Sequence, residues 1–228
     1  MKIAILADSV GSLTRIANAL EQVDGIDVSS VLWLGPRRLP LRRITSMVAR
    51  NGVLLMRLMM RRRLILALGP LDRAPTTDRL RRSSFDVGLH AASTIYRTPT
   101  LSAFRLGVLN AHIGLLPEYR GRSVMEWAIL NGHKPGISVF FMDEGIDSGP
   151  RIVVRELVHL DDAKDSASAK RQLFNLDGVY YAKAVQKLQR PNYQPSIAEE
   201  PGTRYYVMSE LLTRVVDDLI ASGALRLA

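Results

Sequence analysis

Short apolar runs alternate along this chain with segments whose apolar residues recur every three or four positions. The run KIAILA at Lys2–Ala7 predicts a buried strand, and the amphipathic stretch after it predicts a helix over Ser12–Gln22 with Ser12 as its cap. Further apolar runs predict further strands, at Val28–Leu34, Phe85–Ala91, Leu106–Asn110, Ile137–Met142 and Ile152–Leu160. Because strands that alternate with helices form a mostly parallel sheet, we expect an α/β fold with helices flanking that sheet.

The final part of the chain carries longer helical patterns and one break. Apolar residues recur at three or four positions through Ala163–Gln189, which predicts helical structure there. Pro191–Pro201 contains three prolines and reads as a linker. Thr203–Met208 then predicts a strand, and Ser209–Ile220 a last helix capped by Ser209. We therefore expect a main domain over residues 1–190 and a short C-terminal β/α extension over residues 191–228.

Chemically active side chains follow two of the predicted strands. Asn110 ends one strand and His112 enters the loop after it, while Asp147 lies in the acidic loop Asp143–Pro150 that follows another. Because ligands of open α/β sheets bind beyond the carboxyl ends of strands, both sets are expected at one edge of the sheet. An amide, an imidazole and a carboxylate together suit transfer of an acyl group to an amine.

A helix is predicted between these two loops. Ser123–Asn131 begins with a serine and carries Glu126 three positions later, which is the pattern of a capping box. Gly132 follows as a stop signal. The helix is expected to present its apolar residues to the core.

Three motifs in order resemble the folate-dependent formyltransferase family. They are N-x-H followed by L-L-P-x-Y-R-G, then W-A-I-x-x-G, then G-x-S-V-x-F-M-D-E-x-x-D-x-G-P. The family includes glycinamide ribonucleotide transformylase, methionyl-tRNA formyltransferase and the sugar-nucleotide N-formyltransferases. The resemblance implies a Rossmann-like domain, a catalytic set of Asn110, His112 and Asp147, and 10-formyl-tetrahydrofolate as cosubstrate. It also implies contacts to that cosubstrate from Ala91, Ala92, Ser93, Ile95, Phe140, Phe141, Met142 and Asp143.

The resemblance leaves the acceptor amine open among the branches of the family. The form of the Y-R-G and W-A-I motifs is closer to the sugar and tRNA branches, and the first turn, D-S-V-G-S-L, departs from the G-x-G-S-N turn of the purine-pathway enzyme. With some forty residues after the core, the expectation is an amino-sugar nucleotide used in surface polysaccharide assembly. Phosphoribosylglycinamide, methionyl-tRNA and a catalytically silent binding module are the alternatives. Candidate substrate contacts are Ser9, Gly11, Ser12, Arg120 and Arg122, the two arginines being equally compatible with solvated loop charges.

The amino-acid composition excludes several kinds of site. The chain has no cysteine, which excludes a disulfide framework and a thiolate nucleophile, and its four histidines lack ligand spacing, so no metal site is expected. The N-terminal run is a strand and does not match a signal peptide. No uncharged apolar run approaches the length needed to span a bilayer, so a cytoplasmic protein is expected.

The net charge of +9 comes entirely from one segment. Nine arginines lie between Pro36 and Leu64, and no acid occurs from Val28 to Leu71. The Arg-rich insert, residues 36–68, predicts a basic amphipathic helix, and its end at Leu64–Leu68 fits a helix end or a strand. It could face the core with solvated arginines, lie on the inner face of an anionic membrane, or meet a polyanion; the lack of aromatics disfavours nucleic acid. A homodimer is also compatible with the sequence.

Overall fold

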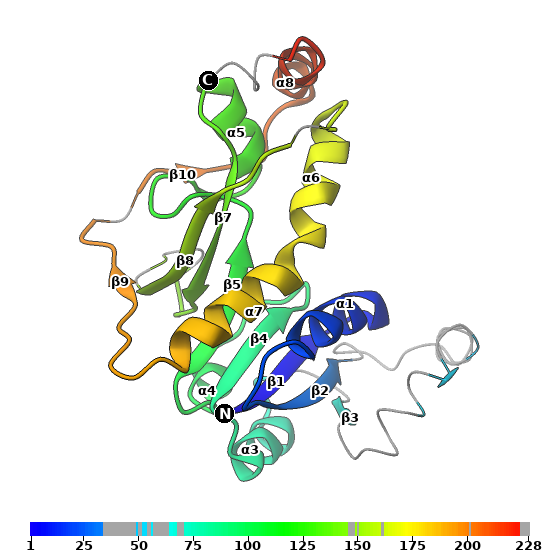
Figure 1. Ribbon diagram of the computed structural model, residues 1–228, viewed down its shortest axis with the longest axis vertical. Helices are drawn as coiled ribbons and strands as arrows, with labels where there is room; N and C mark the ends of the chain where they lie inside the picture. The colour runs from blue at the N-terminus through cyan, green and yellow to red at the C-terminus, as the bar shows by residue number, and fades with distance from the viewer. Residues whose placement is uncertain are drawn as a thin grey trace. The chain divides into compact units, whose positions relative to one another are not determined.

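The computed structural model describes residues 1–33, 49, 52–53, 56, 64–67, 71–145, 149, 151–160, 162–200 and 202–223. The chain divides into two compact units, Met1–Leu109 and Asn110–Ala228 (Figure 1). Most of the Arg-rich insert lies outside the described residues, as does Asp147.

The first unit combines a parallel sheet with helices. Its strands lie in the order β3-β2-β1-β4-β5, and each described pair within the unit is parallel. The bounds are β1 Lys2–Ala7, β2 Asp27–Trp33, β3 Leu64–Ala67, β4 Val87–Ala91 and β5 Gly107–His112, with helices α1 Val10–Leu20, α3 Ala74–Ser83 and α4 Thr98–Leu101. The alternative at Leu64–Leu68 is thereby resolved in favour of a strand. Five of the six residues of β1 are buried, as expected of a strand inside a parallel sheet.

Helix α1 begins earlier than the sequence pattern predicts. Ser9 has extended backbone angles and its Oγ accepts a hydrogen bond from the backbone N–H of Ser12 at 3.2 Å. Ser9 is therefore the cap and Ser12 lies inside the first turn, so the prediction that Ser12 caps the helix is wrong. Ser9 acts as the cap because its side chain reaches a backbone N–H group that has no acceptor within the helix.

The second unit continues from β5 into a mixed sheet. Its strand order is β5-β7-β8-β9, and β8 is antiparallel to both β7 and β9. The bounds are β7 Gly136–Phe141, β8 Arg151–Leu157 and β9 Ser196–Ile197, with helices α5 Val124–Leu130, α6 Ser166–Asn175, α7 Asp177–Leu188 and α8 Glu210–Ala221. A separate parallel pair joins β6, Arg120–Gly121, to β10, Arg204–Tyr205.

The predicted C-terminal elements differ in detail from those in the structure. The helical stretch Ala163–Gln189 is broken at Leu176 into α6 and α7, and α6 starts with a capping box between Asp165 and Ser168. Only two residues of the predicted strand Thr203–Met208 pair in a ladder, and Tyr206 and Val207 are exposed. The predicted linker contains β9, whose short ladder covers the edge of β8.

The capping box predicted for α5 does not form. Ser123 has a left-handed backbone with φ of 51°, and its Oγ accepts a hydrogen bond from Met208 N–H at 3.2 Å. Glu126 is buried, with 4% of its surface exposed, and forms an ion pair with Lys170 of α6. Both side chains therefore bond to residues that are distant in sequence, and neither takes part in a local capping box. The result ties α5 to α6 and to the C-terminal segment, while α8 packs against both helices (Figure 1).

The chain gives no sign of a membrane-spanning helix where it is described. In that part of the molecule, no helix combines the length and apolar character required to cross a bilayer. Among the helices whose bounds the structure describes, α7 and α8 are the longest, with 12 residues each.

The ion pair between Glu126 and Lys170 generates a stability prediction. Replacing Lys170 with Met leaves a buried carboxylate without its cation and should lower the free energy of unfolding by about 2 kcal/mol. The double variant Lys170→Met/Glu126→Gln should recover roughly half of that loss, because the amide carries no charge to desolvate. Urea unfolding of both variants measures this. Equal destabilisation of the single and double variants would contradict the assigned ion pair.

Candidate active site

Two of the predicted catalytic residues lie on one strand. The sequence placed the strand end at Asn110, but β5 continues through His112. Because alternate residues of a strand point to the same face, Asn110 and His112 project from the same side of β5. Asn110 is half-buried and His112 is 7% exposed. The amide and the imidazole are thus brought together by strand geometry.

The His112 ring is held by a backbone carbonyl. Its Nε2 lies 2.9 Å from the Tyr119 carbonyl oxygen. Since a carbonyl oxygen only accepts, Nε2 carries a proton and donates it to that oxygen. The Phe140 ring meets the imidazole edge-on, with centroids 6.5 Å apart. The tautomer and the orientation of His112 are set by these contacts.

Gly114 makes room for this arrangement. A Cβ at position 114 would lie 2.7 Å from the Tyr119 carbonyl oxygen and 2.9 Å from His112 Nε2. Both distances are shorter than real Cβ contacts, so any side chain at this position would push the ring or the carbonyl away. The glycine of the N-x-H-x-G pattern is therefore part of the support for His112.

A buried tyrosine fixes the backbone between the two candidate catalytic residues. Ala111 N–H donates to the hydroxyl oxygen of Tyr181 at 2.9 Å. Tyr181 lies on α7 and is fully buried, and that burial raises its pKa, so the hydroxyl stays protonated. The sequence does not indicate this residue as a neighbour of the site, because it lies 70 positions from Ala111. No local motif marks Tyr181 as a neighbour of the site.

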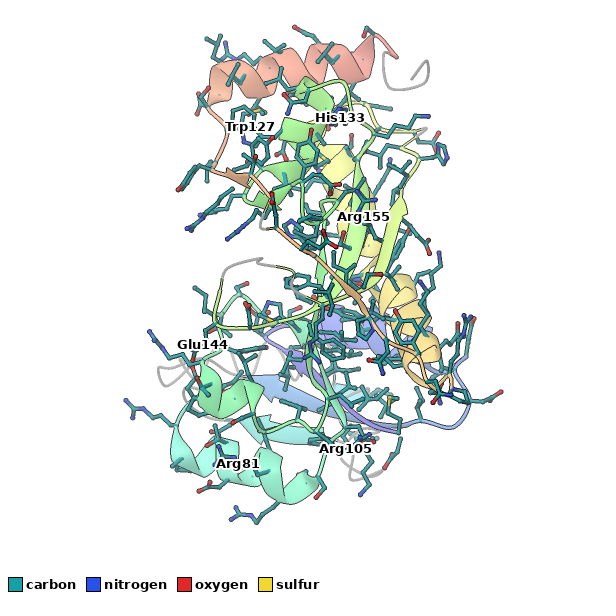
Figure 2. All side chains as sticks on the ribbon, turned by 90° about the vertical axis from the view of Figure 1, so that its left-hand side faces the viewer. Arg81, Arg105, Trp127, His133, Glu144 and Arg155 are labelled. Atoms are coloured by element: carbon teal, nitrogen blue, oxygen red, sulfur yellow. The ribbon has the colours of Figure 1, made fainter. Side chains whose placement is uncertain are left out.

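The loop that supplies the Tyr119 carbonyl is braced from the sheet. Leu116 N–H donates to the buried Ser138 Oγ on β7 at 3.0 Å. Arg155 on β8, labelled in Figure 2, donates from Nε to the Leu116 carbonyl at 2.9 Å and pairs with Glu118 at 2.8 Å. Residues 113–121 are therefore anchored to two strands of the second unit.

The C-terminal segment braces the same loop from outside the sheet. Strand β10 pairs with β6, and the Tyr205 ring stacks on the Tyr119 ring with centroids 5.2 Å apart. Gly121 has a positive φ of 102°, and a Cβ there would lie 2.3 Å from the Tyr205 carbonyl oxygen. A glycine is needed here both for the backbone angle and for the close approach of the two strands. Residues beyond 200 thus help to place the carbonyl that holds His112.

The predicted cosubstrate contacts of the first unit lie on an anchored loop. Ser93 N–H donates to Asp8 Oδ2 at 2.7 Å, which ties the end of β4 to the end of β1. Ala91 is half-buried, Ala92 is buried, and Ile95 is 65% exposed. Burial lowers the pKa of the neighbouring His90 to about 4, and the Asp8 carboxylate only partly offsets this. His90 is therefore neutral near pH 7.

The predicted cosubstrate contacts of the second unit differ in the exposure of their side chains. Phe140 and Phe141 bury their side chains, so only their backbone groups are available to a ligand. Met142 is partly buried against the Leu116–Phe140–Ile152 cluster. Asp143 is exposed and its Oδ1 accepts a hydrogen bond from Gly145 N–H at 2.8 Å.

The candidate substrate contacts have structural roles or lie at the surface. Ser9 caps α1 and Ser12 completes that cap, while a Cβ at Gly11 would meet nothing within 4 Å. Arg120 lies half-buried in β6 and Arg122 is exposed. The structure thus places Ser9, Gly11 and Ser12 together at the N-terminus of α1, in the first unit, and the two arginines in the second.

Comparison with known proteins assigns part of the chain to a family. Residues 79–185 match the family model described as formyl transferase. The methionyl-tRNA formyltransferase of Clostridioides difficile is 33% identical over 89 residues, which cover 39% of this chain and 28% of that protein. The matched stretch is therefore well under two thirds of that relative's length.

Solved structures share the fold over nearly the whole chain. A 4-N formyltransferase from Francisella tularensis superposes with a TM-score of 0.64 at 15% identity, covering 96% of this chain and 87% of that one. The formyltransferase PseJ from Anoxybacillus kamchatkensis, in complex with UDP-4,6-dideoxy-4-formamido-L-AltNAc and tetrahydrofolate, gives 0.57 at 14% identity, with coverage of 99% and 94%. These likenesses confirm the α/β fold, and residues 79–185 match the formyl transferase family model.

Proposed function

We propose that this protein transfers a formyl group from 10-formyl-tetrahydrofolate to a primary amine on a sugar nucleotide. The observation that carries the proposal is the pairing of Asn110 and His112 on one face of β5, with His112 Nε2 held by the Tyr119 carbonyl. An amide group and an imidazole are thereby placed together on one strand, where both can act on a bound substrate. The family of residues 79–185 supports the same reaction class.

The residues expected to meet the cosubstrate suit a pterin ring. Ile95 offers an exposed apolar side chain on a loop that Asp8 anchors, and exposed apolar groups beside fixed backbone donors are typical of ligand sites. The backbone of Phe140–Asp143 would supply the hydrogen-bonding groups of the second unit. When bound, 10-formyl-tetrahydrofolate supplies an activated formyl carbon.

The proposed roles of the side chains follow from their proton chemistry. The reaction forms a C–N bond to the acceptor amine, breaks one to the donor nitrogen, and moves one proton from the amine to that nitrogen. The Asn110 amide and a protonated Nδ1 of His112 can both donate to the formyl oxygen, where negative charge builds up. Asp147 is proposed to stabilise the imidazolium and to accept the amine proton. No covalent intermediate with the protein is needed.

A sugar nucleotide is favoured over the other acceptors. The PseJ structure contains a formylated UDP-sugar, and its likeness extends over 99% of this chain. Arg120 and Arg122 provide positive charge on the loop beyond His112, suited to the phosphates of such a substrate. Methionyl-tRNA and phosphoribosylglycinamide are the alternative acceptors. Membrane binding by the Arg-rich insert and homodimer formation stay predictions of the sequence.

The first test is formyl transfer by the full chain and by variants of β5. His112→Ala and Asn110→Ala should each lower turnover roughly a hundredfold or more, since donors and proton carriers of this kind contribute factors of about 10²–10⁴. Release of tetrahydrofolate, followed by absorbance, measures this. His159→Ala, an exposed histidine of the same unit, is the matched control and should retain full activity. Near-normal turnover in both β5 variants would refute the assignment, and no turnover by the unaltered protein with any amine would favour a silent binding module.

The Tyr181 hydroxyl generates a second prediction. Tyr181→Phe leaves the Ala111 N–H without its acceptor, which should lower the free energy of unfolding by about 1–3 kcal/mol. Because Ala111 lies between the two site residues, kcat should fall about tenfold while the acceptor KM changes little. Tyr180→Phe is the matched control, since it loses a hydroxyl from the same helix turn while Tyr180 has no contact with β5 among the described hydrogen bonds. An unchanged kcat in Tyr181→Phe would show that this bond does not position the site.

The acceptor is tested by competition. With 10-formyl-tetrahydrofolate held constant, kcat/KM for an amino-sugar UDP substrate should exceed that for methionyl-tRNA and for phosphoribosylglycinamide by about a hundredfold, a ratio within reach of hydrogen-bonded recognition. Mass spectrometry of the formylated products gives the rates. Comparable values for methionyl-tRNA would reject the sugar nucleotide while leaving formyl transfer intact.

A further inference from the structure

The second unit contains a cavity that none of the proposed chemistry uses. Its volume is about 760 Å³, within the size range of small-molecule sites. It is lined by the end of α5, by strand β8, by the loop beyond His112 and by the C-terminal segment, and two of its lining residues, His133 and Arg155, are labelled in Figure 2. All of these elements belong to the same compact unit.

A hydrogen-bond chain in the cavity wall sets the direction of its polar groups. The Tyr119 hydroxyl lies 2.6 Å from His133 Nδ1, and burial raises the Tyr119 pKa, so the hydroxyl keeps its proton. Asn131 Nδ2 donates to the Tyr119 hydroxyl at 3.2 Å and to the Tyr205 hydroxyl at 3.4 Å. Tyr205 is thereby left with its own proton to donate.

The charges in the wall favour an anion. Lys134 and Arg155 are the cations of the cavity and Glu118 is its acid, and Arg155 pairs with Glu118 at 2.8 Å. The charge of Glu118 is therefore largely offset, and the Lys134 ammonium gives the cavity a positive balance. Together with the N–H and O–H donors, this balance suits an acceptor-rich group such as carboxylate or phosphate.

The remaining walls are apolar. Leu115 and Leu157 line the cavity, and Leu157 leaves 54% of its surface exposed. An exposed large apolar side chain on a sheet edge beside directed donors is the mixture that small-molecule sites show. A bare anion would leave this apolar surface in water.

We propose that this cavity binds a small molecule that carries a carboxylate or phosphate group on an apolar body. The anionic group lies against Lys134 and the donors, and the apolar body covers Leu115 and Leu157. Tyr119 connects this site with the candidate active site, because its hydroxyl belongs to the cavity and its carbonyl holds His112 Nε2. An occupant that displaces Tyr119 would therefore alter the support of His112. Only this consequence rests on the proposed function; the binding itself does not.

The binding test uses phenyl phosphate as the probe and the full chain as the protein. Phenyl phosphate should shift the imidazole resonances of His133 in NMR spectra in a saturable way. Benzyl alcohol, which lacks the charge, and inorganic phosphate, which lacks the apolar body, should each bind at least about tenfold more weakly. Absence of a saturable shift with phenyl phosphate, or equal binding of inorganic phosphate, would overturn the proposal.

Variants that place a carboxylate in the cavity locate the site. Lys134→Glu and Leu157→Glu should each weaken phenyl phosphate binding about tenfold or more by placing an anion in the cavity. Lys164→Glu makes the same charge change at an exposed position outside the cavity and should leave binding unchanged. Two substitutions are used so that loss of folding in one, detected by circular dichroism, still leaves the other as a test. Equal affinity in the folded cavity variants and in the unaltered protein would refute the site.

Discussion

The hydrogen bond from His112 Nε2 to the Tyr119 carbonyl is the constraint around which the second unit is arranged. It can form only if the loop after β5 turns back to bring residue 119 over residue 112. Ser138 and Arg155 hold Leu116 in that loop, and Gly114 leaves the space that the ring and the carbonyl share. Because the carbonyl accepts only, the bond also requires a proton on His112 Nε2. A single backbone oxygen therefore links the packing of the loop to the chemistry of the site.

The C-terminal segment belongs to the same arrangement although it follows the sheet in sequence. Strand β10 lies beside β6, Tyr205 stacks on Tyr119, and Ser123 accepts a hydrogen bond from Met208 N–H. These contacts add to those that Ser138 and Arg155 make with the loop. Removing them would leave fewer restraints on the Tyr119 carbonyl. The extension thus stabilises the candidate site without supplying a group to it.

Local patterns in the sequence predict the helices and strands better than they predict the tertiary contacts that individual side chains make. Apolar runs predict β1, β4, β7 and β8 because burial in a sheet depends on the residues of the strand itself. The cap of α1 and the pairing of Glu126 were predicted wrongly, since both Ser9 and Ser12 satisfy the local rule and Lys170 lies 44 positions from Glu126. Tyr181 could not be found at all, because a hydroxyl on a distant helix leaves no periodic signal. Rules that consider only residues close in sequence do not predict which side chains make long-range tertiary contacts.

The end of β5 shows how a small error in an element boundary changes the chemistry. If the strand ended at Asn110, His112 would lie in a loop and its direction relative to the amide would be undetermined. With the strand continuing to His112, the two-residue period of extended backbone places both side chains on one face. The intervening Ala111 N–H is satisfied by the Tyr181 hydroxyl. The motif N-x-H therefore depends on strand geometry. The backbone N–H of the middle residue bonds to a buried side chain, and the two outer residues present an amide and an imidazole on the same face of the strand.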